Sequence, residues 1–402
     1  MKRATLATWG RGGIGHSLAH VNALSFCSQA VQLGAVPALI ALRLNASGFS
    51  VTVLGIVAAA PWIAVLLLSQ RIPRLLARHN YLPVNATALV ISAAAVAVII
   101  VASNPFVIFA ANFCLGVGLI LRWIACDSWI IELAPDAIRG RAIGIHETLM
   151  GCGIAAGPLI IALFGSRSAA PLVACLGLLF VATYALFAIG GSAAAQASEA
   201  APTARSLSLI SLMALAAFIA GFIETSSVSF LPVLSLHAHW PIASTLALGV
   251  FTLGGTLLQL PIGYLADKLG YRAAQLITAA VIVTATASFI MLGHQFVPLL
   301  LTLFTLGGAA GAMNTLAVIE AGSSVAANLI SAAASRVALA YTVGSIIGPP
   351  TVGLLVAVLG PASFPFAFAT IGLAFCAARL FSGAQPSGVK TTLPTAVFEA
   401  GT

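Results

Sequence analysis

The sequence predicts an all-α integral membrane protein with twelve transmembrane helices in two six-helix halves. Charged residues make up 6% of the 402 residues, against about 25% in a soluble domain. Hydrophobic residues make up 60%, and the mean hydropathy is +1.10. The apolar residues form continuous runs without two-residue alternation, which indicates helices and not the strands of a barrel. This composition excludes a cytosolic enzyme, a nucleic-acid-binding protein and a disordered chain.

The first half contains six stretches long enough to cross a bilayer, which requires about 20 mostly apolar residues. They cover residues 18–41, 49–69, 82–103, 106–131, 141–165 and 169–191. The first stretch follows a basic N-terminus, but it has full span length and contains polar residues. We therefore expect a retained span and not a cleaved signal peptide.

The second half contains six more stretches of the same kind. They cover residues 207–236, 242–266, 273–293, 296–320, 327–358 and 361–383. Residues 192–206 between the halves are small and polar, which is typical of a linker. We therefore expect an N-terminal half at 1–191, a cytoplasmic linker at 192–206, and a C-terminal half at 207–402 that ends in a short cytoplasmic tail.

The basic residues indicate the orientation of these spans. With both termini inside, fourteen of the seventeen Lys and Arg residues lie on the cytoplasmic side, and only Arg43 and Arg167 lie outside. Such a bias in short loops supports twelve spans with cytoplasmic ends. We expect the protein in a plasma membrane, specifically a bacterial inner membrane. Arg122 is the exception, because it falls inside a span.

Glycine and proline recur at related places in the two halves. The set in the fifth and eleventh spans comprises Gly144, Gly153, Gly157, Pro158, Gly344, Gly348 and Pro349. Small residues allow helices to approach closely, and proline bends them, so we expect helix packing at both places. Two similar six-span halves in tandem are typical of transporters with a parallel repeat.

The loop after the eighth span reads GYLADKLGYR at residues 263–272. It resembles the cytoplasmic signature of the major facilitator superfamily at Gly263, Leu265, Asp267, Lys268, Gly270 and Arg272. The resemblance implies that Asp267 meets a helix N-terminus and a basic residue and thereby latches one conformation. Arg336 is the candidate partner, and the alternative is an ordinary turn with a helix-capping Asp. The loop after the second span has neither Asp nor Gly.

The resemblance implies a secondary transporter that works by alternating access, similar to the small bacterial drug- and sugar-efflux facilitators. The fifth-span pattern resembles the antiporter signature of the superfamily, which favours export of a small organic solute coupled to protons. Uptake of a sugar or organic acid is an alternative, as is a non-transporting receptor or assembly protein of the same fold. We expect a monomer in the bilayer, no nucleic acid, no cofactor, no metal and no enzymatic activity.

Ionisable groups inside spans are costly and mark candidate sites. Glu224 falls near the membrane midplane and is the best candidate proton carrier, since burial favours the neutral form of a carboxylic acid. Asp127 and Glu147, each about 9 Å from the cytoplasmic side, are further proton-coupling candidates. Arg122 is expected to bind an anionic substrate group or to reset the carboxylate, with a structural pair to Asp127 or Glu147 as the alternative.

Uncharged polar residues complete the expected cavity. Asn22, Ser25, Gln29 and Gln32 form one stripe on the first span. We expect Gln29 and Gln32 to face the cavity, and interhelical hydrogen bonding is the alternative. Asn314 in the tenth span and Tyr341 in the eleventh join the candidate substrate-binding residues. His146, which stands beside Glu147, is noted without an assigned role.

Overall fold

A computed structural model describes residues 14–135, 138–189, 211–237, 243–323 and 330–382. The expected linker at 192–206 lies outside this part of the chain. The described residues form helices and no strand. Within these described residues, eleven helices are long and apolar enough to cross a membrane, or twelve if Ser244–Leu257 and Pro261–Leu269, which meet at 41°, form one bent span. The all-α membrane fold is confirmed, and the protein is an integral membrane protein.

The first half begins with a span that changes its helical winding. The span consists of α1 (Ile14–Gln29), a π-helical segment η2 (Ala30–Ala35) and α2 (Val36–Ala46). It is followed by α3 (Val51–Leu68), α4 (Ile72–Arg78), α5 (Tyr81–Val101), α6 (Pro105–Leu133), α7 (Arg139–Phe164) and α8 (Ala170–Ala188). The Asn104 side chain accepts a 2.8 Å hydrogen bond from the backbone N–H of Phe106 and so caps α6.

The second half repeats this succession of long helices. It contains α9 (Leu212–His237), α10 (Ser244–Leu257), α11 (Gln259–Leu269), α12 (Tyr271–Leu292), α13 (Phe296–Ser323), α14 (Ile330–Leu359) and α15 (Ser363–Phe381). Gly270, at a φ of 80°, allows the sharp turn from α11 to α12, because a left-handed backbone is costly for other residues.

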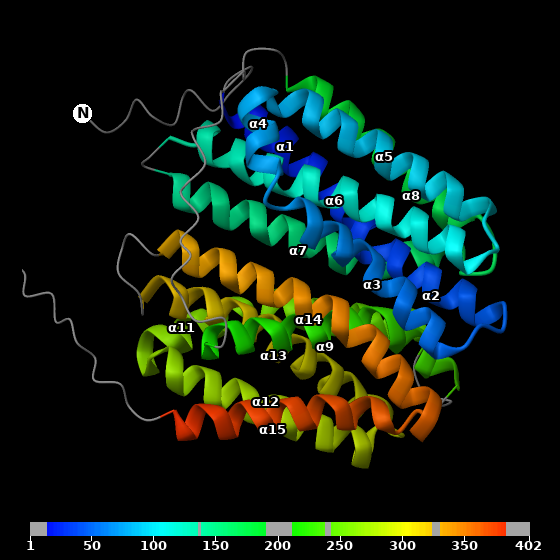
Figure 1. Cartoon of the computed structure of the whole chain (residues 1–402), viewed down its shortest axis with the longest axis vertical. Helices are drawn as coiled ribbons and strands as arrows, with labels where there is room; N and C mark the ends of the chain where they lie inside the picture. Colours follow the sequence, from blue (N-terminus) through cyan, green and yellow to red (C-terminus); the bar gives the residue numbers. More distant parts are fainter. Residues whose placement is uncertain (1–13, 136–137, 190–210, 238–242, 324–329, 383–402) are drawn as a thin grey trace, which may run out of the picture.

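The two groups of helices lie side by side, with α1–α8 above and α9–α15 below in Figure 1. They meet mainly along α3 with α14, α7 with α10, and α2 with α9. We call the end of the molecule that carries α4 and the α11–α12 turn the basic end. The opposite end, which carries the α2–α3 and α14–α15 turns, is called the far end (Figure 1).

Close backbone contact joins the halves towards the far end. A Cβ on Gly55 of α3 would lie 2.3 Å from the carbonyl oxygen of Pro349 on α14. A Cβ on Gly353 would lie 2.6 Å from the carbonyl oxygen of Val51. Since real Cβ atoms do not approach other atoms so closely, glycine is needed for α3 and α14 to touch here.

The predicted packing residues of α7 and α14 mostly lie at helix crossings. A Cβ on Gly157 would lie 2.2 Å from the carbonyl carbon of Gly34, and one on Gly153 would lie 2.6 Å from the carbonyl oxygen of Phe26. Gly344 approaches Phe218 in the same way. Gly348 approaches Phe222, whereas Gly144 has no neighbouring atom within 4 Å of its Cβ position. Pro158 and Pro349 both lie inside their helices.

Candidate functional site

A cavity of about 140 Å³ lies between the two halves. Its walls come from α3, α7, α9, α10 and α14, with further residues from η2, α2, α11 and α13. Most lining side chains are apolar or aromatic, and several hydroxyl groups are interspersed among them. Among the lining residues that the structure describes, Glu224 is the one charged group. The cavity therefore combines a largely apolar wall with a single carboxylate.

Glu224 is held by a tyrosine from the neighbouring helix. The Tyr341 hydroxyl of α14 donates a hydrogen bond of 2.5 Å to Oε2 of Glu224 on α9. The two helices come close enough for this contact because Gly221 lies against the backbone of Tyr341, where a Cβ would be 2.1 Å from the carbonyl oxygen. The Tyr341 ring also meets Trp62 of α3 edge-on, with ring centroids 5.5 Å apart. Tyr341 thus joins the carboxylate to the opposite half.

The other carboxylate oxygen of Glu224 points towards α13. It lies 3.5 Å from the Cβ position of Gly311, and the side-chain nitrogen of Gln259 lies 3.2 Å from the same point. A larger residue at Gly311 would therefore press on both polar groups. Asn314, one turn further along α13, is half-buried and does not line the described cavity.

Arg122 lies inside the N-terminal half and not in the cavity. Its side chain is 0% exposed. Its Nε donates a 3.0 Å hydrogen bond to Oε1 of Gln32, and its Nη2 donates to Oε1 of Gln29. Gln32 in turn donates to the Ser92 hydroxyl at 2.8 Å. The structure therefore brings Arg122, Gln29 and Gln32 together as an interhelical hydrogen-bond network, away from the cavity wall.

The two glutamines lie at the start of the π-helical segment η2. Gln29 directly precedes η2 and Gln32 lies within it. Both side chains reach the same guanidinium group on α6. π-Helical turns inside α-helices are frequently found at functional sites. The predicted polar stripe is thus used for contacts between α1, η2, α5 and α6.

Asp127 and Glu147 lie nearer the basic end on α6 and α7. Oδ1 of Asp127 is 3.3 Å from Nε2 of His146. Nδ1 of His146 is in turn 2.7 Å from Oδ1 of Asn22 on α1. Glu147 has an exposed side chain. Neither Asp127 nor Glu147 lines the cavity that contains Glu224.

The signature loop has an exposed Asp267. Within the described residues, no ion pair joins Asp267 to Arg336, which is half-buried on α14. Lys268 lies over the ring of Tyr264 at 4.5 Å, and Gly270 makes the turn before Arg272 on α12. Gly263 has open space around its Cβ position. The expected latch contact between Asp267 and Arg336 is thus not formed in this structure, in which α11 packs mainly against α12 and α13.

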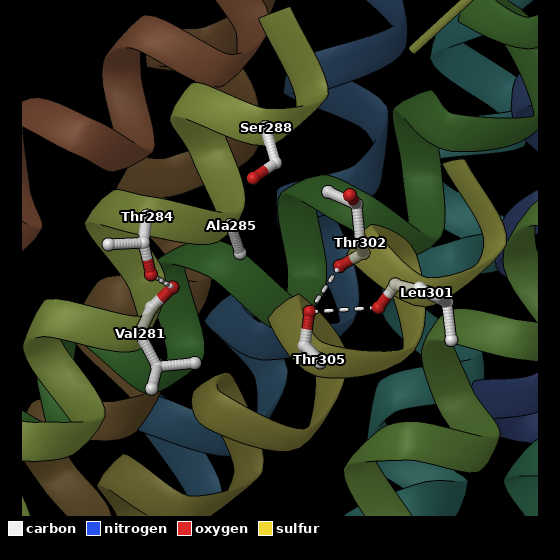
Figure 2. A pocket seen from close by; sticks show the side chains of 7 residues that line it. All are labelled: Val281, Thr284, Ala285, Ser288, Leu301, Thr302 and Thr305. Atoms are coloured by element: carbon white, nitrogen blue, oxygen red, sulfur yellow. Dashed lines mark hydrogen bonds between the residues drawn. The ribbon is translucent and has the colours of Figure 1, made fainter. Parts of the chain in front are cut away.

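A second hollow, of about 240 Å³, lies between α12 and α13. Figure 2 shows its lining of hydroxyl and apolar side chains. The Thr284 and Thr305 hydroxyls donate to carbonyl oxygens of their own helices. No ionisable group lines this hollow among the described residues. The cavity with Glu224 is therefore the better candidate site.

The comparison with protein families decides the assignment. The model of the Major Facilitator Superfamily matches residues 18–329 and, in a second match, residues 213–397. The chain belongs to the major facilitator superfamily. It is a membrane transporter of this type and not an enzyme.

Individual relatives of this facilitator are distant. It is 24% identical over 327 residues to the uncharacterized MFS-type transporter YfkF of Bacillus subtilis, a match that covers 77% of this chain and 81% of YfkF. Its fold is similar to crystal structures of the nucleoside transporter NupG and of a point mutant of NupG. Their TM-scores are 0.77 and 0.75 at 14% identity, over 90% and 92% of this chain and 98% and 99% of theirs. A bacterial homologue of the human lysosomal transporter Spinster, in an inward-facing and unoccupied conformation, gives a TM-score of 0.69 at 13% identity, over 92% of both chains.

Several cavity residues of this facilitator were not predicted from its sequence. Trp62 lies in an apolar run, where a tryptophan gives no separate signal. The hydroxyl residues Thr225 and Ser229, and likewise Thr252 and Thr256, line the cavity in pairs four residues apart. That spacing places each pair on one helix face, so it is a signal that could have identified them.

Proposed function

We propose that this facilitator exports a small organic solute in exchange for protons, with Glu224 as the proton carrier. The observation that carries the proposal is the position of Glu224. It is the one charged group among the described residues of the cavity wall, between two halves that would move relative to each other in alternating access. A carboxylate in this position is able to exchange a proton for a substrate.

The cavity wall supports a substrate that is uncharged or cationic and partly apolar. Trp62, Phe251 and Tyr341 provide aromatic surface, and the four hydroxyl residues provide polar contacts. No Lys, Arg or His is found among the described lining residues. Arg122, which was expected to bind an anionic substrate group, is buried away from the cavity. The cavity wall therefore does not favour an anionic substrate.

The direction of transport rests on the α7 pattern. Gly153, Gly157 and Pro158 belong to the motif that resembles the antiporter signature, and the two glycines lie against α1 and η2. We further propose that the basic end faces the cytoplasm, because it carries arginines and cytoplasmic loops are enriched in Lys and Arg. With this orientation, the contact between α3 and α14 near the far end belongs to a conformation in which the transporter is closed towards the outside of the cell.

Flux measurements in proteoliposomes test this proposal. A panel of labelled amines, nucleosides, sugars and sugar acids is offered with an imposed pH gradient. We expect an acidic lumen to drive accumulation of an uncharged or cationic compound, and a protonophore to abolish it. Sugar acids should not accumulate. Accumulation driven by an acidic bath would support uptake instead, and absence of flux for the whole panel would support a non-transporting protein.

A further inference from the structure

We propose that the short helix α4 binds the headgroup of an anionic phospholipid through Arg71, Arg74 and Arg78. Residues 69–80, which join α3 to α5, contain these three arginines and no Asp or Glu. Because α3 and α5 are both membrane spans, α4 lies at the membrane surface, at the basic end of the molecule (Figure 1). The segment therefore places three positive charges at the depth of the lipid headgroups.

The sequence of α4 gives the helix a buried side and a basic side. Ile72 and Leu76 lie one turn apart and are 2% and 4% exposed, and α4 packs mainly against α6. At about 100° per residue, the three arginines fall within about 60° of one another, on the side away from Ile72 and Leu76. All three are exposed. The fold thus fixes one side of α4 and leaves the arginines together on the other.

No carboxylate in the described part of the chain neutralises these arginines. Their guanidinium groups form no ion pair and no hydrogen bond with the described residues. The neighbouring helix α6 carries two carboxylates, Asp127 and Glu132. Asp127 faces His146, and Glu132 accepts a hydrogen bond from the hydroxyl of Tyr81. The guanidinium groups are therefore available to a phosphate group, which their planar arrangement of donors suits.

Leu75 favours a lipid over a soluble anion. It lies between the buried side and the arginines, and 36% of its side chain is exposed. An apolar side chain next to basic residues suits the boundary between headgroups and acyl chains, where the apolar group enters the membrane and the basic groups meet anionic headgroups. A free phosphate ion would leave Leu75 in water.

The corresponding turn of the C-terminal half has a different charge. Between α11 and α12, Asp267 accompanies Lys268 and Arg272, and Lys268 lies over the ring of Tyr264 at 4.5 Å. One acidic residue thus offsets part of the positive charge there, whereas α4 has no such residue. A lipid bound at α4 would therefore attach the N-terminal half to the membrane surface without holding the C-terminal half.

Native mass spectrometry of the full chain tests the proposal without a transport substrate. The protein is kept in a neutral detergent, and phosphatidylglycerol, which is anionic, or phosphatidylcholine, which is zwitterionic, is added. We expect the first phosphatidylglycerol molecule to bind at least about tenfold more tightly than phosphatidylcholine, since each arginine near an anionic lipid surface contributes about fivefold. R74Q/R78Q should lose at least about tenfold in affinity for phosphatidylglycerol. Equal affinity of the unmodified protein for both lipids would overturn the proposal.

Two control variants separate α4 from general attraction between charges. R167Q removes an exposed arginine at the far end and should leave the affinity for phosphatidylglycerol unchanged. R74K/R78K keeps the positive charge and should retain the preference for phosphatidylglycerol. Because the arginines of α4 have no partner in the described protein, all variants should keep the melting temperature of the unmodified protein. Unchanged affinity in folded R74Q/R78Q, or an equal loss in R167Q, would overturn the proposal.

Discussion

The Tyr341 hydroxyl donates a 2.5 Å hydrogen bond to Glu224, and the ring of the same tyrosine lies edge-on against Trp62 of the opposite half. One side chain therefore contacts both the proposed proton carrier and the interface between the halves. A change in the charge of Glu224 alters the hydrogen bond to Tyr341 and, through its ring, the contact with Trp62. Under the proposed function, this contact would link proton binding at Glu224 to the movement of the two halves.

The variant Y341F tests this link. It keeps the ring against Trp62 but removes the hydrogen bond to Glu224. A hydrogen bond to a charged group typically contributes about 1.5–3 kcal/mol of stabilisation. We expect proton-driven transport to fall by about tenfold or more, since about 1.4 kcal/mol corresponds to a factor of ten. The matched control is Y81F, because Tyr81 donates an equally short bond to Glu132 outside the cavity. Equal loss in both variants would argue against a special role for Tyr341.

Gly55 provides a test of the contact between the halves. A side chain at this position would collide with the backbone of Pro349, so G55V should disfavour the state in which α3 and α14 touch. We expect transport to fall at least about tenfold and cysteine probes near the far end to become more reactive. Gly177 is exposed on α8 with nothing within 4 Å of its Cβ position, so G177V is the control. Unchanged probe reactivity in G55V would contradict this view of the interface.

Arg122 is expected to act through structure and not through substrate contact. R122M leaves the buried oxygens of Gln29 and Gln32 without their donor, which costs about 1–3 kcal/mol for each unsatisfied group. We therefore expect a lower melting temperature and little change in the KM for any transported compound. A selective rise in KM for anionic compounds, at unchanged stability, would instead restore Arg122 as a substrate-binding residue.

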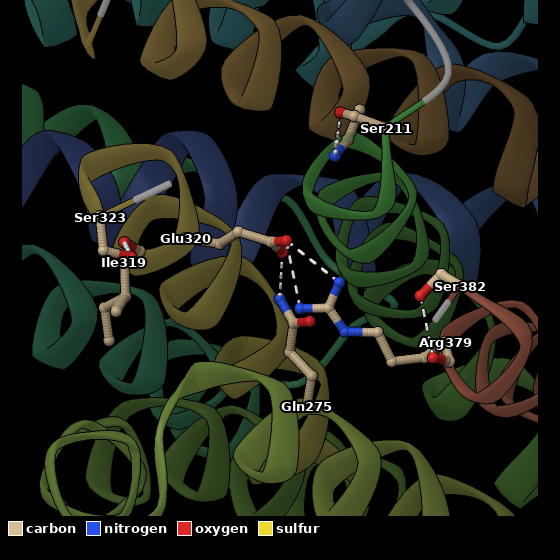
Figure 3. Close-up of polar contacts among 8 residues, drawn as sticks. Ser211, Gln275, Ile319, Glu320, Ser323, Arg379 and Ser382 are labelled. Carbon is tan, nitrogen blue, oxygen red and sulfur yellow. Dashed lines mark hydrogen bonds and ion pairs between the residues drawn. The ribbon is translucent and has the colours of Figure 1, made fainter. Parts of the chain in front are cut away.

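A buried ion pair joins α13 and α15 in the C-terminal half. Two nitrogens of Arg379 on α15 donate to Oε1 of Glu320 on α13, each at 3.1 Å, and Gln275 of α12 donates to Oε2 at 2.8 Å (Figure 3). Removing one partner of a buried pair costs about 3–5 kcal/mol. R379M should therefore lower the melting temperature in detergent clearly, whereas R74M, at an exposed arginine, should not. Equal melting temperatures would show that the pair contributes nothing.

The sequence was sufficient to predict the helical membrane fold, because apolar run length and charge bias follow directly from the thickness and solvent properties of a bilayer. It also identified Glu224 and Tyr341 separately as candidate residues. Their direct contact could not be predicted, because it depends on the close approach of α9 and α14 at Gly221.

Arg122 shows that the depth of a residue in the membrane does not predict its contacts. Residue counting places it well inside the membrane, but depth does not specify which neighbour its helix face meets. Gln29 and Gln32 share one face of their helix and both accept from the guanidinium group, but residue counting does not specify that this face meets Arg122. Likewise, residue counting gives Asp127 and Glu147 a similar depth, but the preceding residue, His146, is the one whose Nε2 lies 3.3 Å from Oδ1 of Asp127.

The most direct test of the central claim compares two kinds of transport in one variant. E224Q removes the proposed carrier while keeping a side chain of similar shape in the cavity. We expect proteoliposomes with E224Q to lose accumulation driven by a pH gradient but still to exchange substrate at equal pH. E132Q, which alters a carboxylate with the same short tyrosine bond outside the cavity, should retain both activities. Proton-driven accumulation that persists undiminished in E224Q would show that Glu224 is not the proton carrier.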